Sequence, residues 1–145
     1  MAEYQHILLA TDFSPESDAI VKRAKTLQAS SQCRLSIIHV LEPISIAYGG
    51  EFPVDLGDLH KELEKQASEK LDALSKELGV ESANCFLEVG ITEKEIIRVA
   101  DSEKIDLIVL GSHGRHGLSL LLGSTANAVL HHAKCDVLAV RVFND

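Results

Sequence analysis

Residues 107–130 read LIVLGSHGRHGLSLLLGSTANAVL, and they are the part of the chain that says most about its fold. It opens with four apolar residues in a row, which is typical of a strand covered on both faces in a parallel sheet. A glycine-rich loop follows, and a helix is expected from Gly123 to Ala133. A strand, a glycine loop and a helix in this order predict a parallel α/β fold whose ligands bind beyond the carboxyl ends of the strands.

Four other segments have the character of strands. Residues 7–10, 37–40 and 137–140 are apolar without polar alternation, so we expect them in the same sheet. Polarity alternates along residues 84–89, which is typical of a less covered strand at an edge. The last strand should also lie at an edge, where unpaired N–H and C=O groups invite pairing with another chain.

Helical patterns fill the connections between these strands. Apolar residues spaced three or four apart from Leu56 to Leu78, closed by Gly79, form the clearest of them. Ser14 is the expected N-cap of the first helix, with Pro15 at the first helical position. Residues 92–95, with Thr and Glu three apart, predict a capping box at the start of the third helix.

The alternation of strands and helices indicates the fold class. Five strands joined by right-handed helical crossovers form a doubly wound five-stranded parallel sheet with helices on both faces. A length of 145 residues and a hydrophobic content of 46% suit a single globular domain over residues 1–145. The pattern does not specify the order of the strands within the sheet.

Composition limits the partners and the compartment. A formal net charge of -8 argues against a broad nucleic-acid or acidic-membrane surface, because either would need clustered Lys and Arg. The three cysteines have neither disulfide nor zinc spacing, so we expect reduced, buried thiols. The first residues lack the pattern of a secretion signal, and no apolar run approaches the length of a membrane span. The sequence therefore predicts a cytoplasmic protein.

The glycine loop and the first strand together are similar to a known family. LIVLGSHGRHGLSLLLGSTANAVL followed by CDVLAV resembles the signature of the universal stress proteins, and ILLATDFSPES at residues 7–17 matches as well. The similarity covers the chain, with IIHV at 37–40 and LEVG at 87–90. The resemblance implies a Rossmann-like, adenine nucleotide alpha hydrolase-like sheet. It also implies a stress-response role and a homodimer formed through the last strand, Val137 to Val142.

The resemblance further implies that the cofactor is ATP, with or without Mg²⁺. Asp12 and the backbones of Ala10 and Val40 would face adenine, and Gly111 would lie beside the ribose. The phosphates would be surrounded by backbone N–H groups and hydroxyls, which are those of Gly114, Gly123, Ser124 and Thr125.

The spacing of the glycines leaves two functions open. The ATP-binding branch of the family has Gly, two residues, Gly, nine residues, Gly and then Ser or Thr. Here only eight residues separate Gly114 from Gly123, and residues 54–63, VDLGDLHKEL, resemble the branch that does not bind ATP. The leading hypothesis is an ATP-binding stress-response module acting as a homodimer. The alternative is a protein-interaction module that works without nucleotide.

Several polar residues have a structural interpretation beside the functional one. Asp12 can support the start of the first helix instead of contacting adenine. His113 and His116 lack a third metal ligand or a positioned carboxylate, which argues against a metal or catalytic role. His39, inside an apolar strand, is expected to be a hydrogen-bonded core histidine. No nucleophile with an activating base is evident, so any ATP hydrolysis or autophosphorylation should be slow.

Overall fold

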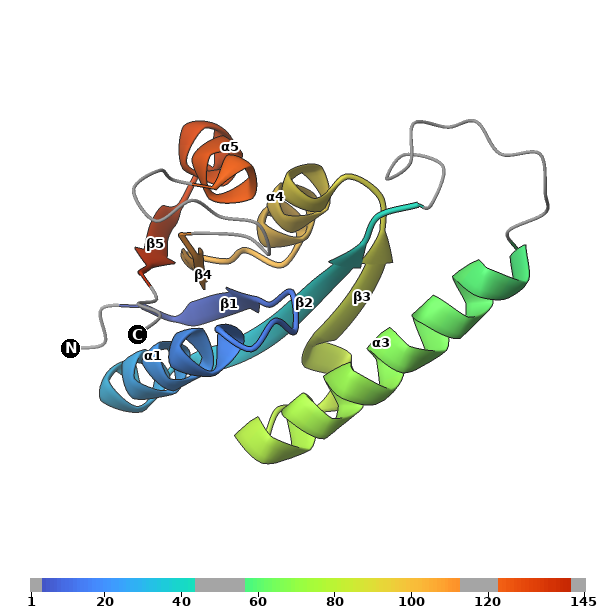
Figure 1. The fold of residues 1–145 in the computed structure, drawn as a ribbon. Coiled ribbons are helices and arrows are strands. Elements are labelled where there is room, and N and C mark those ends of the chain that lie inside the picture. The colour runs from blue at the N-terminus through green and yellow to red at the C-terminus, as the bar shows by residue number, and fades with distance from the viewer. Residues whose placement is uncertain (1–3, 44–56, 113–122, 142–145) are drawn as a thin grey trace.

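The computed structural model describes residues 4–43, 57–112 and 123–141, and Figure 1 shows its helices and strands. The strands are β1 (His6–Ala10), β2 (Arg34–Leu41), β3 (Cys85–Val89), β4 (Leu107–Gly111) and β5 (Asp136–Val140). The helices are α1 (Ser17–Ser31), α3 (Gly57–Leu78), α4 (Thr92–Ser102) and α5 (Ser124–His132), with a short 3₁₀ helix, η1, at Ser82–Asn84.

The five strands form one parallel sheet with the order β3-β2-β1-β4-β5. The predicted fold class is therefore confirmed. Strands β3 and β5 are the two edges, as expected from the polar alternation of one and the terminal position of the other. The sequence order of the strands reverses between β1 and β4, and in sheets of this kind ligands bind where that reversal occurs.

Two apolar clusters hold the helices against the two faces of the sheet. Successive residues of β1 alternate between them: Leu8 belongs to the cluster that includes α4 and α5, while Ile7 and Leu9 belong to the cluster that includes α1. All three are fully buried. At about 25 cal/mol per Å² of apolar surface, burial on both faces is the main term that stabilises such central strands. Figure 1 shows α1 and α3 on one side of the sheet and α4 and α5 on the other.

The first helix begins later than its sequence predicts. Helix α1 starts at Ser17, and the N-cap position is Glu16, which makes no side-chain cap. Ser14 is not the N-cap, because the helix begins three residues after it; its N–H donates to Asp12 Oδ1 at 2.9 Å in a local turn. The N–H of Ser17 then donates to the carbonyl of Ser14 at 3.0 Å. Pro15 therefore lies in a turn before the helix.

The predicted capping box of α4 is also wrong. Thr92 is the first helical residue, and its hydroxyl donates to Glu42 Oε1 at 2.9 Å instead of capping the helix. The Glu95 carboxylate accepts from Arg98 Nη2 at 2.8 Å.

The predicted end of helix α3 is confirmed. The helix stops at Leu78, and Gly79 has φ 68°, the left-handed conformation that ends many helices.

The cysteines are unpaired, as expected, but they are half-buried and not fully buried. The pKa of each thiol is raised, and burial is the largest cause for all three, Cys33, Cys85 and Cys135. Among the described helices, none has the length and the apolar character that a membrane crossing requires.

Candidate functional site

Strand β1 stops before both of its neighbours at the carboxyl edge of the sheet. Ala10, its last residue, pairs with Ile38, whereas β2 continues to Leu41. On the other side Leu9 pairs with Val109, and β4 continues to Gly111. The chain after β1 therefore turns away beside the longer ends of β2 and β4. The reversal of strand order thus coincides with the place where the central strand ends before both of its neighbours.

The turn after β1 is fixed by short hydrogen bonds. Thr11 is 7% exposed; its N–H donates to the carbonyl of Ile38 at 3.0 Å, and its Oγ1 accepts from the N–H of Phe13 at 3.1 Å. The Thr11 carbonyl lies 2.8 Å from His39 Nδ1, so this ring nitrogen carries the proton and donates. His39 is 6% exposed, which confirms the predicted hydrogen-bonded core histidine.

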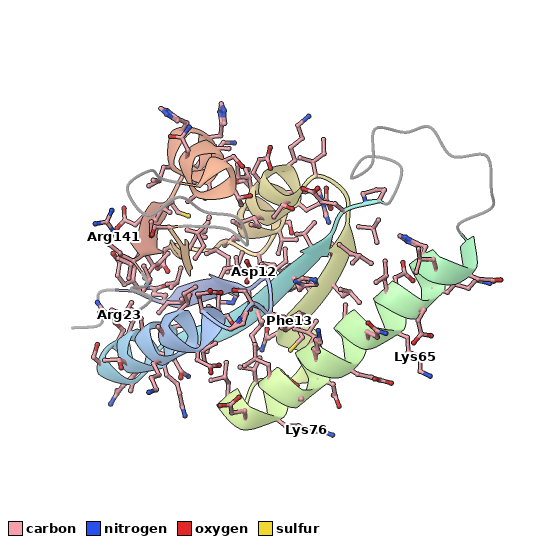
Figure 2. All side chains as sticks on the ribbon, viewed as in Figure 1. Asp12, Phe13, Arg23, Lys65, Lys76 and Arg141 are labelled. Carbon is pink, nitrogen blue, oxygen red and sulfur yellow. The ribbon has the colours of Figure 1, made fainter. Side chains whose placement is uncertain are left out.

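Asp12 lies in the middle of this turn. Its Oδ1 accepts from the N–H of Ser14, as the structural interpretation of this residue expects. That bond orders the chain before α1. It does not use up the acceptor capacity of the side chain, because a carboxylate can accept from several donors at once. Figure 2 shows Asp12 and Phe13 next to each other at the end of β1.

The two residues that flank the glycine loop meet at the end of β4. The N–H of Gly123 donates to the carbonyl of Ser112 at 2.6 Å, and the N–H of Ser112 donates to the carbonyl of Val140 at 2.9 Å. Gly123, the N-cap of α5, has an extended backbone and no side-chain cap. The N–H groups of Ser124 and Thr125 have no acceptor within the helix, as in every first helical turn. The start of α5 is therefore fixed directly beside β4.

The charge around the start of α5 favours an anion. Helices α1, α3 and α4 carry Asp or Glu in their first turns, while α5 carries none in its first turn. An acidic side chain in the first turn offsets the positive end of the helix dipole, so the dipole of α5 stays uncompensated there. His131 and His132 occupy the last turn, at the negative end. Of the four α-helices described, α5 has the N-terminus best suited to bind a phosphate.

Seven of the eight predicted site residues lie at this edge of the sheet or at the start of α5. Val40 is 9% exposed and belongs to the core cluster beneath α4 and α5, and Ala10 packs against that cluster. Their side chains are thus used in packing, and the role of their backbones toward a ligand stays a prediction. The remaining members are Asp12, Gly111, Gly123, Ser124 and Thr125.

Other predicted features lie outside the described residues. These are Gly114, the two loop histidines His113 and His116, and most of the long connection after β2. The described ranges contain no group of three His, Cys, Asp or Glu side chains placed to hold a metal ion.

The prediction from sequence missed two participants in the turn after β1 and one beside the glycine loop. Thr11 and Phe13 hold the turn on either side of Asp12, and Ser112 is 6% exposed and bonded to β5. A polar residue directly after an apolar strand was the available signal for Thr11 and Ser112. No signal in the sequence marks Phe13.

Comparison with known proteins decides the family. The model of the universal stress protein family matches residues 3–141. The chain belongs to this family. Universal stress protein A homolog 1 of Coxiella burnetii is 44% identical over 138 residues, which cover 94% of this chain and 96% of the relative. Membership supports a role in stress response.

Solved structures of universal stress proteins have the same fold. The structure of MJ0577 from Methanocaldococcus jannaschii aligns over 98% of this chain and 99% of its own, with a TM-score of 0.81 and 30% identity. A universal stress protein solved in complex with cAMP is 27% identical, covers 95% of this chain and 97% of its own, and has a TM-score of 0.62. A nucleotide is therefore bound by at least one protein of similar structure.

Proposed function

We propose that this universal stress protein is an ATP-binding stress-response module. The observation that carries the proposal is the position of the α5 N-terminus. Its first turn lacks acidic residues, and the hydrogen bond between Gly123 and Ser112 holds it at the end of β4. Strand β4 is the direct neighbour of β1, whose following residues include Asp12. A nucleotide across this edge would have its phosphates at α5 and its base near β1 and β2.

The phosphate end cannot supply the affinity alone. Micromolar binding requires about 8 kcal/mol, while a hydrogen bond to a charged group contributes a net of about 1.5–3 kcal/mol. Three such bonds, from the backbone around Gly123 and from Ser124 and Thr125, give at most about 9 kcal/mol before the cost of immobilising the ligand. The adenine end, with Asp12 and the backbones of Ala10 and Val40, must therefore contribute as well.

Binding without fast chemistry fits the described residues. The first turn of α5 contains no carboxylate that would hold a magnesium ion beside the phosphates, so Mg²⁺ would arrive with the nucleotide. Hydrolysis or autophosphorylation is expected to be slow, because phosphoryl transfer depends on positioned charge at the transferred group. Nucleotide occupancy would then act as a signal, and we expect this signal to operate in the cytoplasm.

The proposal includes a homodimer formed through residues 137–142. Among the described strands β5 is an edge of the sheet, and its outer N–H and C=O groups pair with none of the others. Beside it lies a groove of about 440 Å³, lined by Tyr4, Leu27, Leu107, Asp136, Val137 and Leu138. Its apolar side chains suit the edge strand of a second copy, which would cover them on pairing.

The test begins with protein purified from cells. Gel filtration and heat release show whether it carries a nucleotide, and thermal shifts with ATP, GTP and cAMP show which nucleotide stabilises it. A ligand at one hundred times its Kd stabilises a protein by about 2.7 kcal/mol, which is easily measured as a shift in Tm. We expect the largest shift with ATP. A larger shift with cAMP would change the assigned nucleotide. No shift with any of the three would favour the nucleotide-independent interaction module.

A further inference from the structure

Phe13 has a backbone conformation that is rare for its type. Its φ is 58°, in the left-handed region, which is unfavourable for a bulky side chain and is usually taken by Gly, Asn or Asp. Such a conformation persists only where the surroundings enforce it, and it is concentrated at functional sites.

The ring of Phe13 packs on the imidazole of His39. The two ring centroids are 4.4 Å apart and the planes are inclined by 38°, which is the range in which aromatic pairs attract. The same imidazole donates from Nδ1 to the carbonyl of Thr11 at 2.8 Å. His39 therefore contacts the residue on each side of Asp12. It sits in the middle of β2, which pairs with both β1 and β3.

Phe13 reaches the buried ring of His39 from outside the two apolar clusters. Phe13 is half-buried and belongs to neither apolar cluster of the sheet. It also lines a groove of about 300 Å³ between the start of α1 and the second half of α3, where Ser17 and Leu74 are among its neighbours. Removing the ring therefore leaves both cores intact. It removes the ring contact with β2, while the two hydrogen bonds between Thr11 and β2 remain.

We propose that Phe13 and His39 are positioning residues of the nucleotide site: together they fix the turn that presents the Asp12 carboxylate to the base. This inference rests on the proposed function, because the ligand is the adenine end of ATP. Without the ring, the part of the turn after Thr11 loses its contact with β2 and Asp12 leaves its position. The consequence is a loss of base discrimination, with the phosphate end at α5 unchanged.

The first arm of the test needs no nucleotide. The N–H of Ser14 donates to Asp12 Oδ1, so its hydrogen exchange reports the position of that carboxylate. In Phe13→Gly, which accepts the same backbone conformation, we expect exchange at Ser14 to speed up by about two- to tenfold, the size of a typical aromatic pair. Phe13→Asn, which also tolerates a left-handed φ, should do the same. Phe13→Tyr keeps the ring and should restore protection. Unchanged exchange in both ring-free variants would overturn the proposal.

The second arm measures base discrimination by comparing ATP with inosine triphosphate, which lacks the amino group that a carboxylate accepts from. The wild type should prefer ATP, and Phe13→Gly should lose that preference while retaining most of its affinity for inosine triphosphate. Equal weakening of both nucleotides would mean a general structural role and would refute the inference. A wild type that binds neither nucleotide would refute the proposed function and, with it, the nucleotide part of the inference. The exchange result would still decide whether the rings fix the turn.

Discussion

The buried pair of His6 and Ser36 gives a prediction of stability that follows from geometry. His6 is 5% exposed and Ser36 is fully buried, and His6 Nε2 lies 2.7 Å from Ser36 Oγ. The ring nitrogen and the hydroxyl can each donate or accept in this pair. Each satisfies a polar group of the other that is shielded from water.

The substitution Ser36→Ala removes the hydroxyl and leaves His6 Nε2 buried without this partner. An unsatisfied buried donor or acceptor costs about 1–3 kcal/mol, and we expect the free energy of unfolding to fall by that amount. In a domain of this size Tm should fall by about 4 °C for each kcal/mol. The measurement is urea unfolding at pH 8, where His6 is neutral. Ser68→Ala on the exposed surface of α3 is the matched control and should change stability by less than about 0.5 kcal/mol. Equal stability of Ser36→Ala and the control would refute this reasoning.

Three further predictions test other parts of the structure. Burial and the charge of Arg34 lower the pKa of His6, and they outweigh the opposing effect of Glu103 and Asp106. The unfolded chain therefore binds a proton at this imidazole more tightly than the folded chain does. The stability contributed by neutral His6 should be complete above about pH 6.5 and fall as the pH decreases toward its folded pKa. Unfolding curves at several pH values check this, and His6→Gln should remove the dependence. Val137→Lys should shift a dimer to a monomer in light scattering, because a charge on an edge strand opposes pairing; an unchanged mass would reject this interface. The three thiols, with raised pKa values, should react slowly with a disulfide reagent at pH 7.5 until urea exposes them; fast reaction of the folded protein would contradict their burial.

The core of the fold was predictable because one property of the sequence determines it. Runs such as Ile7 to Ala10 and Leu107 to Leu110 are apolar on both faces, and only the inside of a covered parallel sheet satisfies them. Strand order was not predictable, since it depends on which strands pack together after the chain has folded. The edge position of β3 was predictable, because its polarity alternates and an edge strand tolerates a charged residue such as Glu88.

The starts of α1 and α4 were mispredicted because a local capping pattern does not fix where a helix begins. After Asp12 the chain first makes a turn, in which the Ser14 N–H donates to Asp12, and the helix begins only at Ser17. At α4 the Thr92 hydroxyl donates to Glu42, which is distant in the sequence and close only in the fold. The left-handed φ of Phe13 was beyond prediction for the same reason. Its enforcing partner, His39, belongs to another strand.

The position of the candidate site was predictable, because loops after parallel strands meet at one edge. The precise role of its members was not, since the packing of Val40 and Ala10 into the core is visible only in the folded chain. The turn that carries Asp12 likewise depends on Thr11 and Phe13.

Calorimetric titration with ATP and magnesium tests the central claim most directly, on the nucleotide-free wild type and on Gly123→Val. Gly123 has φ -62° and ψ 155°, which valine also adopts, so the substitution adds bulk at the start of α5 without straining the backbone. Ser68→Val, on the exposed surface of α3, is the matched control. We predict micromolar binding by the wild type and the control, and an affinity at least about tenfold weaker for Gly123→Val, a loss of about 1.4 kcal/mol. Equal binding by all three proteins would contradict a phosphate site at α5, and no heat with the wild type would contradict ATP binding itself.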